Sequence, residues 1–158
     1  AGLKRVASHG LFLWCTFATW FRHYDRSRPR FAVSLPDGRV VDDAYFALCC
    51  NTNPYTYLGT RPLHITPHAT LERPLVMLTV RSLRFAHIAG LGARALVGSR
   101  GVGGSRWVDE ATDLHEVAVH GHGPFSYQVD GDHLGDTTEL RFRWAPDALR
   151  LVLPAPTR

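Results

Sequence analysis

The chain has 158 residues, of which 45% are hydrophobic and 20% are charged, and its net charge is +4. These values are those of one ordinary folded domain and exclude an intrinsically disordered chain. Its three cysteines, two of them adjacent, do not make a disulfide framework, so we expect a reducing, cytosolic compartment. The positive charge suits nucleotides, anionic lipid headgroups or nucleic acid and does not choose between them.

The N-terminal region, residues 1–28, is predicted to contain a helix over residues 3–25. Its stretch GLFLWCTFATWF is strongly apolar but spans only 12 residues, too few to cross a membrane. The helix is apolar over most of its circumference, so most of its surface should be covered. The surface of this helix could be covered by the protein core, by a lipid or by a domain outside this chain.

Three strands are predicted in the next part of the chain. PRFAVSL, residues 29–35, and RVVDD, residues 39–43, alternate in polarity and are joined by a PDG turn. The run AYFALCCN, residues 44–51, is almost continuously apolar, which predicts a central strand covered on both faces. Cys49 and Cys50 would then point to opposite faces, so they should not share a metal.

The second half is predicted to be mostly β. Residues 51–74 contain four prolines and should form a long ordered loop with a short strand near residues 63–65. Residues 84–97 follow a helical period and predict a second helix, and the glycine-rich residues 98–106 predict a flexible linker. The remaining strand signals cover residues 75–82, 113–121, 124–131, 137–145 and 148–154. Hairpin-length gaps between the strands predict antiparallel layers, so the fold class is mostly β with two helices (α+β).

The sequence PFSYQVDGDHLGD places Asp130 and Asp132 on either side of a glycine. Asp-Gly between two β-prone runs is the strongest short-range signal for a hairpin. A carboxylate at a strand end can also hold and deprotonate a hydroxyl group. The tyrosine-rich loop NTNPYTYLGTRPL, residues 51–63, could wall such a site.

Other catalytic and binding patterns are weak in this sequence. The segment GSRGVGGSR lacks the lysine of a phosphate-binding loop, and no Gly-x-Ser-x-Gly motif occurs. His115, His120 and His122 lack further ligands at a recognisable zinc spacing. No helix carries a basic stripe with base-reading residues, so we expect no nucleic-acid partner.

Two motifs in this order, NPYTYLG and YQVDGD, resemble the C-terminal half of the diacylglycerol kinase catalytic family. The resemblance covers roughly residues 29–154 and is strongest to bacterial soluble lipid kinases related to sphingosine kinases, of the arginine-rich actinobacterial type. It implies an antiparallel β-sandwich-like C-terminal domain of the diacylglycerol kinase / NAD kinase-like fold over residues 29–158. It also implies an N-terminal ATP-binding domain with a Gly-Gly-Asp-Gly motif. This chain contains no such motif and begins with Ala1, so we expect it to be the second domain of a longer protein.

The family pattern implies roles for individual positions. Asp132 matches the acid that ends the family's Asp-Gly-Glu, the candidate proton acceptor for a lipid hydroxyl, and is one methylene shorter. Asp130 matches the first acid of that motif and would also shape the turn. The family's magnesium loop usually reads Asp-Gly where this chain has Arg73 and Pro74, so we expect no metal at that place. The positions that match the family's cleft-facing loop are the expected substrate-binding residues: Asn51, Tyr55, Tyr57, Leu58 and Gly59.

The resemblance therefore implies an ATP-dependent lipid kinase, of which this chain would be the lipid-side domain, inactive when alone. The acceptor would be a hydroxyl of a diacylglycerol-like or sphingoid-like lipid. ATP and Mg²⁺ would be held mainly by the N-terminal domain. The enzyme would be cytoplasmic and peripheral at the membrane, with transient contact to the membrane surface. Assembly of two copies into a homodimer is left as an alternative to a monomer. The alternative is a non-catalytic lipid-binding or structural module of the same fold.

Overall fold

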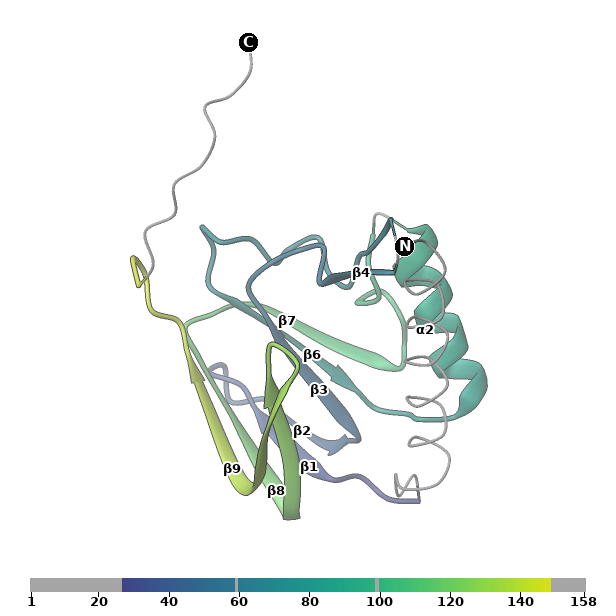
Figure 1. Ribbon diagram of the computed structural model, residues 1–158. Helices are drawn as coiled ribbons and strands as arrows, with labels where there is room; N and C mark the ends of the chain where they lie inside the picture. The colour runs from purple at the N-terminus through teal and green to yellow at the C-terminus, as the bar shows by residue number, and fades with distance from the viewer. Residues whose placement is uncertain (1–26, 59, 99, 149–158) are drawn as a thin grey trace.

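The structure is a computed structural model that describes residues 27–58, 60–98 and 100–148 (Figure 1). The described part contains nine strands and one helix. In chain order they are β1 (Phe31–Ser34), β2 (Val40–Ala44), β3 (Phe46–Cys50), β4 (Thr56–Leu58), β5 (Arg61–Leu63), β6 (Leu75–Val80), α2 (Phe85–Val97), β7 (Val108–Leu114), β8 (Glu116–Val129) and β9 (Asp132–Arg143). The helix expected over residues 3–25 and the strand expected over residues 148–154 lie, all but residue 148, outside the described residues.

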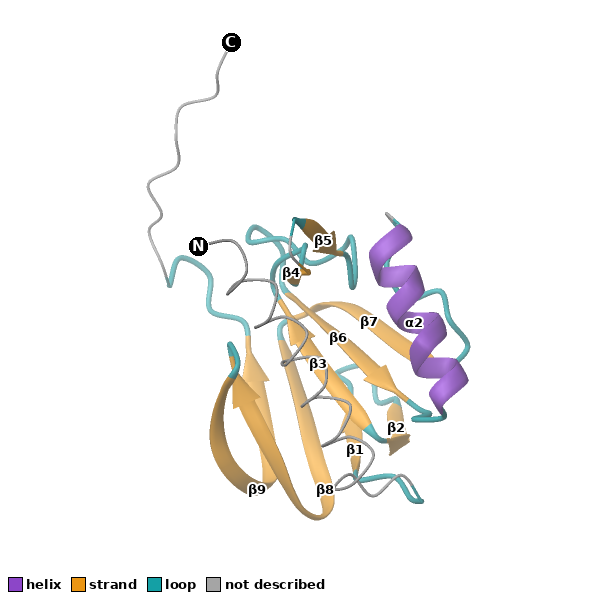
Figure 2. Ribbon diagram, turned by 45° about the vertical axis from the view of Figure 1, so that its right-hand side comes forward, coloured by secondary structure: helices purple, strands orange, loops and turns teal. Residues whose placement is uncertain are grey.

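The strands form two main antiparallel sheets and a small hairpin. The first sheet has the order β2-β1-β8-β9, the second has the order β3-β6-β7, and β4 pairs with β5 alone. The second sheet lies between the first sheet and α2, as Figure 2 shows. The expected α+β class with antiparallel layers is thus confirmed, with one helix in the described part.

Strand β6 is the centre of the fold because it is buried on both faces. Val76 and Leu78 belong to the apolar core under α2, together with Leu91 and Ala95 of the helix. Met77 belongs to the core between the two sheets. That second core also contains the inward-facing side chains of β1, β2, β7 and β8: Phe31, Val33, Val41, Ala44, Ala111, Leu114, Val117, Val119 and Phe125.

Strand β3 corrects one expectation from the sequence. Its apolar run predicted a central strand, but β3 lies at the edge of the second sheet and β6 lies at the centre. The run is apolar because both faces of β3 are nonetheless covered. Cys49 packs against the core between the sheets and Cys50 lies in the core under α2, so their expected opposite directions are confirmed.

The glycine-rich segment 98–106 is not the flexible linker that its composition predicted. Val102 is buried, and its backbone N–H donates a hydrogen bond to the carbonyl of Ile65 at 2.7 Å. Gly101 has a positive φ of 66°, and a Cβ there would lie 2.3 Å from the same carbonyl. Glycine is therefore needed for close packing of this segment on the chain that precedes β6.

Two strands have bounds that differ from those expected from the sequence. The short strand expected near residues 63–65 is β5 at Arg61–Leu63, which is the return strand of a hairpin with β4. The single strand expected over residues 113–121 is divided between β7 and β8, with His115 between them.

Burial makes the two described cysteines poor nucleophiles. Burial raises the pKa of the Cys49 thiol to about 12, with Cys50 adding to the shift, and burial raises the pKa of Cys50 to about 11. The thiolate is the reactive form, so we expect both to react with Ellman's reagent far more slowly in the native protein than in guanidinium at the same pH. The assay uses the Cys15→Ser variant, so that only these two thiols are counted. Fast labelling of the native protein would contradict their burial.

Candidate functional site

The turn at Asp130-Gly131 is a two-residue hairpin, as the sequence predicted. Val129 of β8 pairs directly with Asp132 of β9, and the two residues between them have positive φ angles of 51° and 94°. Positive φ at both central positions is the geometry that favours Asp-Gly, because it matches the twist of the strands. Asp130 and Asp132 are both exposed at the tip of this hairpin.

The Asp130 carboxylate at the hairpin tip acts electrostatically on the phenol of Tyr55 in the tyrosine-rich loop. The pKa of Tyr55 is raised from its ordinary value of 10.0 first by partial burial, then by the Cys50 thiol and the Asp130 carboxylate. An acidic group acts in this way only when it lies near the phenol. The Asp130 carboxylate therefore lies within electrostatic range of Tyr55, although the two residues are far apart in the sequence.

The other residues expected to bind substrate have different environments. Asn51 is exposed, and Tyr57 is 60% exposed on β4. Leu58 ends β4 and pairs with Arg61 of β5. Gly59 lies outside the described residues. Exposed apolar side chains thus occur both on the tyrosine-rich loop and on the β8–β9 hairpin, where Val129 beside the turn is half exposed.

The start of the loop is held by an internal polar contact. The Asn53 amide nitrogen lies 3.1 Å from the Nδ1 atom of His64, which follows β5, and the backbone N–H of Tyr55 donates to the carbonyl of Leu63 at 3.0 Å. The backbone N–H of His64 in turn donates to the carbonyl of Ala95 in α2 at 2.9 Å. The helix therefore supports the β4–β5 hairpin that carries the tyrosines.

Arg73, in the position of the family's metal loop, makes an ion pair. Its guanidinium donates to both carboxylate oxygens of Asp113, with Nε–Oδ1 and Nη2–Oδ2 distances of 3.0 and 2.5 Å. The pKa of Asp113 is lowered chiefly by this hydrogen bond. Among the described residues no group of three or more His, Cys, Asp or Glu side chains could hold a metal. The residues present here do not fit a magnesium ion.

We expect magnesium to leave the stability of this chain unchanged. The Asp113 carboxylate is already paired with Arg73, so no set of free oxygen ligands is available for a hard cation. The measurement is the thermal midpoint in millimolar MgCl₂, compared with the midpoint in a chelator at equal ionic strength. A higher midpoint in magnesium would reveal a site that this arrangement does not provide.

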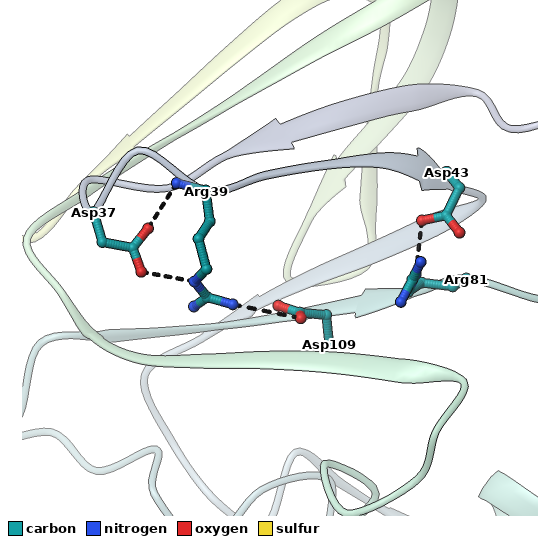
Figure 3. Close-up of polar contacts among 5 residues, drawn as sticks. All are labelled: Asp37, Arg39, Asp43, Arg81 and Asp109. Carbon is teal, nitrogen blue, oxygen red and sulfur yellow. Dashed lines mark hydrogen bonds and ion pairs between the residues drawn. The ribbon is translucent and has the colours of Figure 1, made fainter.

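A second polar arrangement links the two sheets along one side (Figure 3). Arg39 donates through Nε to Asp37 at 2.7 Å and lies 3.6 Å from Asp109 of β7, while Arg81 after β6 donates to Asp43 of β2 at 2.7 Å. Arg39, Asp43, Arg81 and Asp109 line an open groove of about 420 Å³. Because each of the two arginines is paired with a carboxylate, we assign this groove to the contact between the sheets and not to a binding site.

A further cluster escaped sequence analysis. The His87 ring stacks on Trp107 with centroids 3.8 Å apart, and the Arg106 guanidinium lies 4.4 Å from the Trp107 ring centre. The hydroxyl of Ser82 lies 2.8 Å from Nδ1 of His87. The only signal in the sequence was the Arg-Trp pair at the end of the glycine-rich segment, which does not show that it meets α2.

No protein-family model matches this chain, and a search of curated proteins finds no match either. In the described residues, no helix is both long enough and apolar enough to pass through a membrane. The site is therefore defined by its own geometry: a tyrosine-bearing loop and a hairpin tip with two exposed carboxylates.

Proposed function

We propose that this chain is the lipid-side domain of an ATP-dependent lipid kinase. The observation that supports the proposal is the electrostatic effect of Asp130 on Tyr55, because these residues belong to the two motifs that resemble the diacylglycerol kinase catalytic family. A shared location is what one substrate site made by both motifs requires. The antiparallel α+β architecture is compatible with the β-sandwich-like domain that the resemblance implies.

In this proposal the hairpin tip handles the lipid hydroxyl. Asp132 accepts the hydroxyl proton as the lipid oxygen bonds to the transferred phosphorus and the bond to the donor's leaving oxygen breaks. Asp130 holds the turn and adds negative charge beside Tyr55. Phosphoryl transfer depends mainly on positioning and on charge stabilisation, so a fixed carboxylate next to the acceptor is a sufficient contribution from this domain.

The phosphoryl donor and magnesium are assigned to a second domain outside this chain. Arg73, which matches the acid of the family's metal loop, is instead paired with Asp113, and the described residues do not fit a metal ion. The side chains that would contact the lipid are Asn51, Tyr55 and Tyr57, because they belong to the exposed loop whose Tyr55 responds to the Asp130 carboxylate. The exposed tyrosine rings offer apolar surface to an acyl chain and a hydroxyl to its polar end.

The test is transfer of labelled phosphate from ATP to a lipid panel that contains a diacylglycerol, a sphingoid base and a glycolipid. The samples are the longest reading frame that contains this chain and the 158-residue chain alone. We expect a labelled phospholipid from the longer protein only, and its identity would name the acceptor. Lipid binding without any labelled product would favour the second candidate, a non-catalytic lipid-binding module.

A further inference from the structure

We propose that the surface formed by Arg84, Arg106 and Trp107 attaches the protein to an anionic lipid bilayer. This surface, the arginine–tryptophan surface, lies where β6 leads into α2 and where the glycine-rich segment leads into β7. The inference takes a lipid membrane as partner from the proposed function. It does not need catalysis, so the two can be tested separately.

The arginine–tryptophan surface carries positive charge that no carboxylate pairs with among the described residues. Arg84 and Arg106 are exposed, and neither has an ion-pair partner among the described residues, unlike Arg39, Arg73 and Arg81. The first turn of α2 also carries no acidic residue. Two arginines without a nearby carboxylate can attract an external anion with their full charge. The field of a paired arginine is largely cancelled by its carboxylate.

The aromatic ring of this surface, Trp107, is held in place by its neighbours. Trp107 is half-buried, with His87 stacked on it at 3.8 Å and Arg106 lying 4.4 Å from its ring centre. The backbone N–H of Arg81 donates to the carbonyl of Trp107 at 2.9 Å, which fixes the residue at the sheet. Tryptophan beside arginine is the composition of the membrane–water interface, where the indole meets acyl chains and the guanidinium meets phosphate.

A third observation shows that both arginines belong to one surface. The pKa of His87 is lowered by burial first, and then by the charges of Arg84 and of Arg106. The backbone N–H of His87 also donates to the carbonyl of Arg84 at 3.0 Å, so Arg84 lies in the same helical turn as the ring that stacks on Trp107. The surface lies at the N-terminal end of α2, whereas the β4–β5 hairpin contacts the C-terminal end through Ala95. We assign it to membrane attachment and not to the lipid hydroxyl.

The test is sedimentation of the full chain with vesicles of phosphatidylcholine, with and without phosphatidylglycerol. Removing both arginines in Arg84→Gln/Arg106→Gln should weaken binding to the anionic vesicles about 25-fold, at about 5-fold for each charge. The control Arg141→Gln/Arg143→Gln removes the same charge from β9, where each arginine is paired with a glutamate. We expect the control to lose much less affinity.

Several results would distinguish membrane attachment from a net-charge effect, from phosphate binding and from nucleic-acid binding. Equal loss in both double variants would mean that only net charge matters, and no binding of the parent chain to anionic vesicles would overturn the inference outright. Displacement from vesicles by inorganic phosphate at constant ionic strength would assign the surface to free phosphate. Tighter binding to RNA with the same dependence on Arg84 and Arg106 would assign it to nucleic acid. Circular dichroism of each variant confirms that it is folded.

Loss of lipid phosphorylation does not decide this question. If vesicle binding falls in Arg84→Gln/Arg106→Gln while phosphorylation of a detergent-dispersed lipid persists, the attachment surface and the proposed kinase are both supported. If vesicle binding is strong but no lipid is ever phosphorylated, the attachment surface stands and the kinase proposal fails.

Discussion

Replacing Asp132 by asparagine is expected to lower lipid phosphorylation by the longest reading frame that contains this chain by about 100-fold or more. A positioned general base contributes about 10²–10⁴ to the rate, and asparagine cannot accept the proton. Asp132 is exposed at the first position of β9, so the substitution should leave folding intact. The measurement is the initial rate with the lipid acceptor identified from the panel, together with the thermal midpoint of each variant.

Two further carboxylates on the same hairpin, those of Asp130 and Asp136, allow the effect of Asp132→Asn to be compared with matched substitutions. Asp130→Asn keeps the turn, because asparagine tolerates the positive φ of 51° that Asp130 adopts. Asp136→Asn is the matched control, since Asp136 is exposed on β9 and its bond from Ser126 can be kept by an amide oxygen. A normal rate in Asp132→Asn with a large loss in Asp130→Asn would move the proton-accepting role to Asp130. Normal rates in both would return the segment to an ordinary turn.

The second large effect is on stability. Leu78→Ala is expected to lower the free energy of unfolding by about 2–5 kcal/mol, because it removes a fully buried side chain and leaves a cavity. Leu78 is 1% exposed on β6 and packs in the core beneath α2. The helix supports the β4–β5 hairpin, so this loss should also loosen the tyrosine-bearing loop.

Urea unfolding of Leu78→Ala and Leu134→Ala measures this effect against a matched substitution. Leu134 is 54% exposed on β9, and its truncation should change the free energy of unfolding by about 0.5 kcal/mol or less. Equal destabilisation by both variants would mean that the core does not lie where β6 and α2 place it.

The elements that the sequence predicted are those fixed by local rules. The hairpin at Asp130-Gly131 follows from the turn geometry that only two adjacent residues need to satisfy. The helix expected at residues 84–97 was found at Phe85–Val97, because its apolar period is contained within one segment. The opposite directions of Cys49 and Cys50 follow from strand alternation alone.

The features that the sequence did not predict depend on distant partners. The edge position of β3 is set by its pairing with β6, and an edge strand with both faces covered has the same apolar pattern as a central one. The path of residues 100–106 depends on the carbonyl of Ile65, which accepts a hydrogen bond from the backbone N–H of Val102. The Arg73–Asp113 pair spans 40 positions, and no local pattern indicates which acid an arginine will meet.

The candidate site shows the same division. Both of its segments were proposed from short motifs, whereas their distance from one another depends on the tertiary fold. The electrostatic effect of Asp130 on Tyr55 could not have been predicted from either motif.

The proposed function requires Tyr55 to lie close to the hairpin tip, and paramagnetic relaxation measures this proximity directly. A nitroxide label is placed at Asp132→Cys in the Cys15→Ser background, where the buried Cys49 and Cys50 should not react, and a second sample carries the label at Arg143→Cys at the far end of β9. The account predicts strong broadening of the Tyr55 amide signal from the label at position 132 and weaker broadening from position 143. A sharp Tyr55 signal with the label at position 132 would contradict it, because the two motifs would then not form one site.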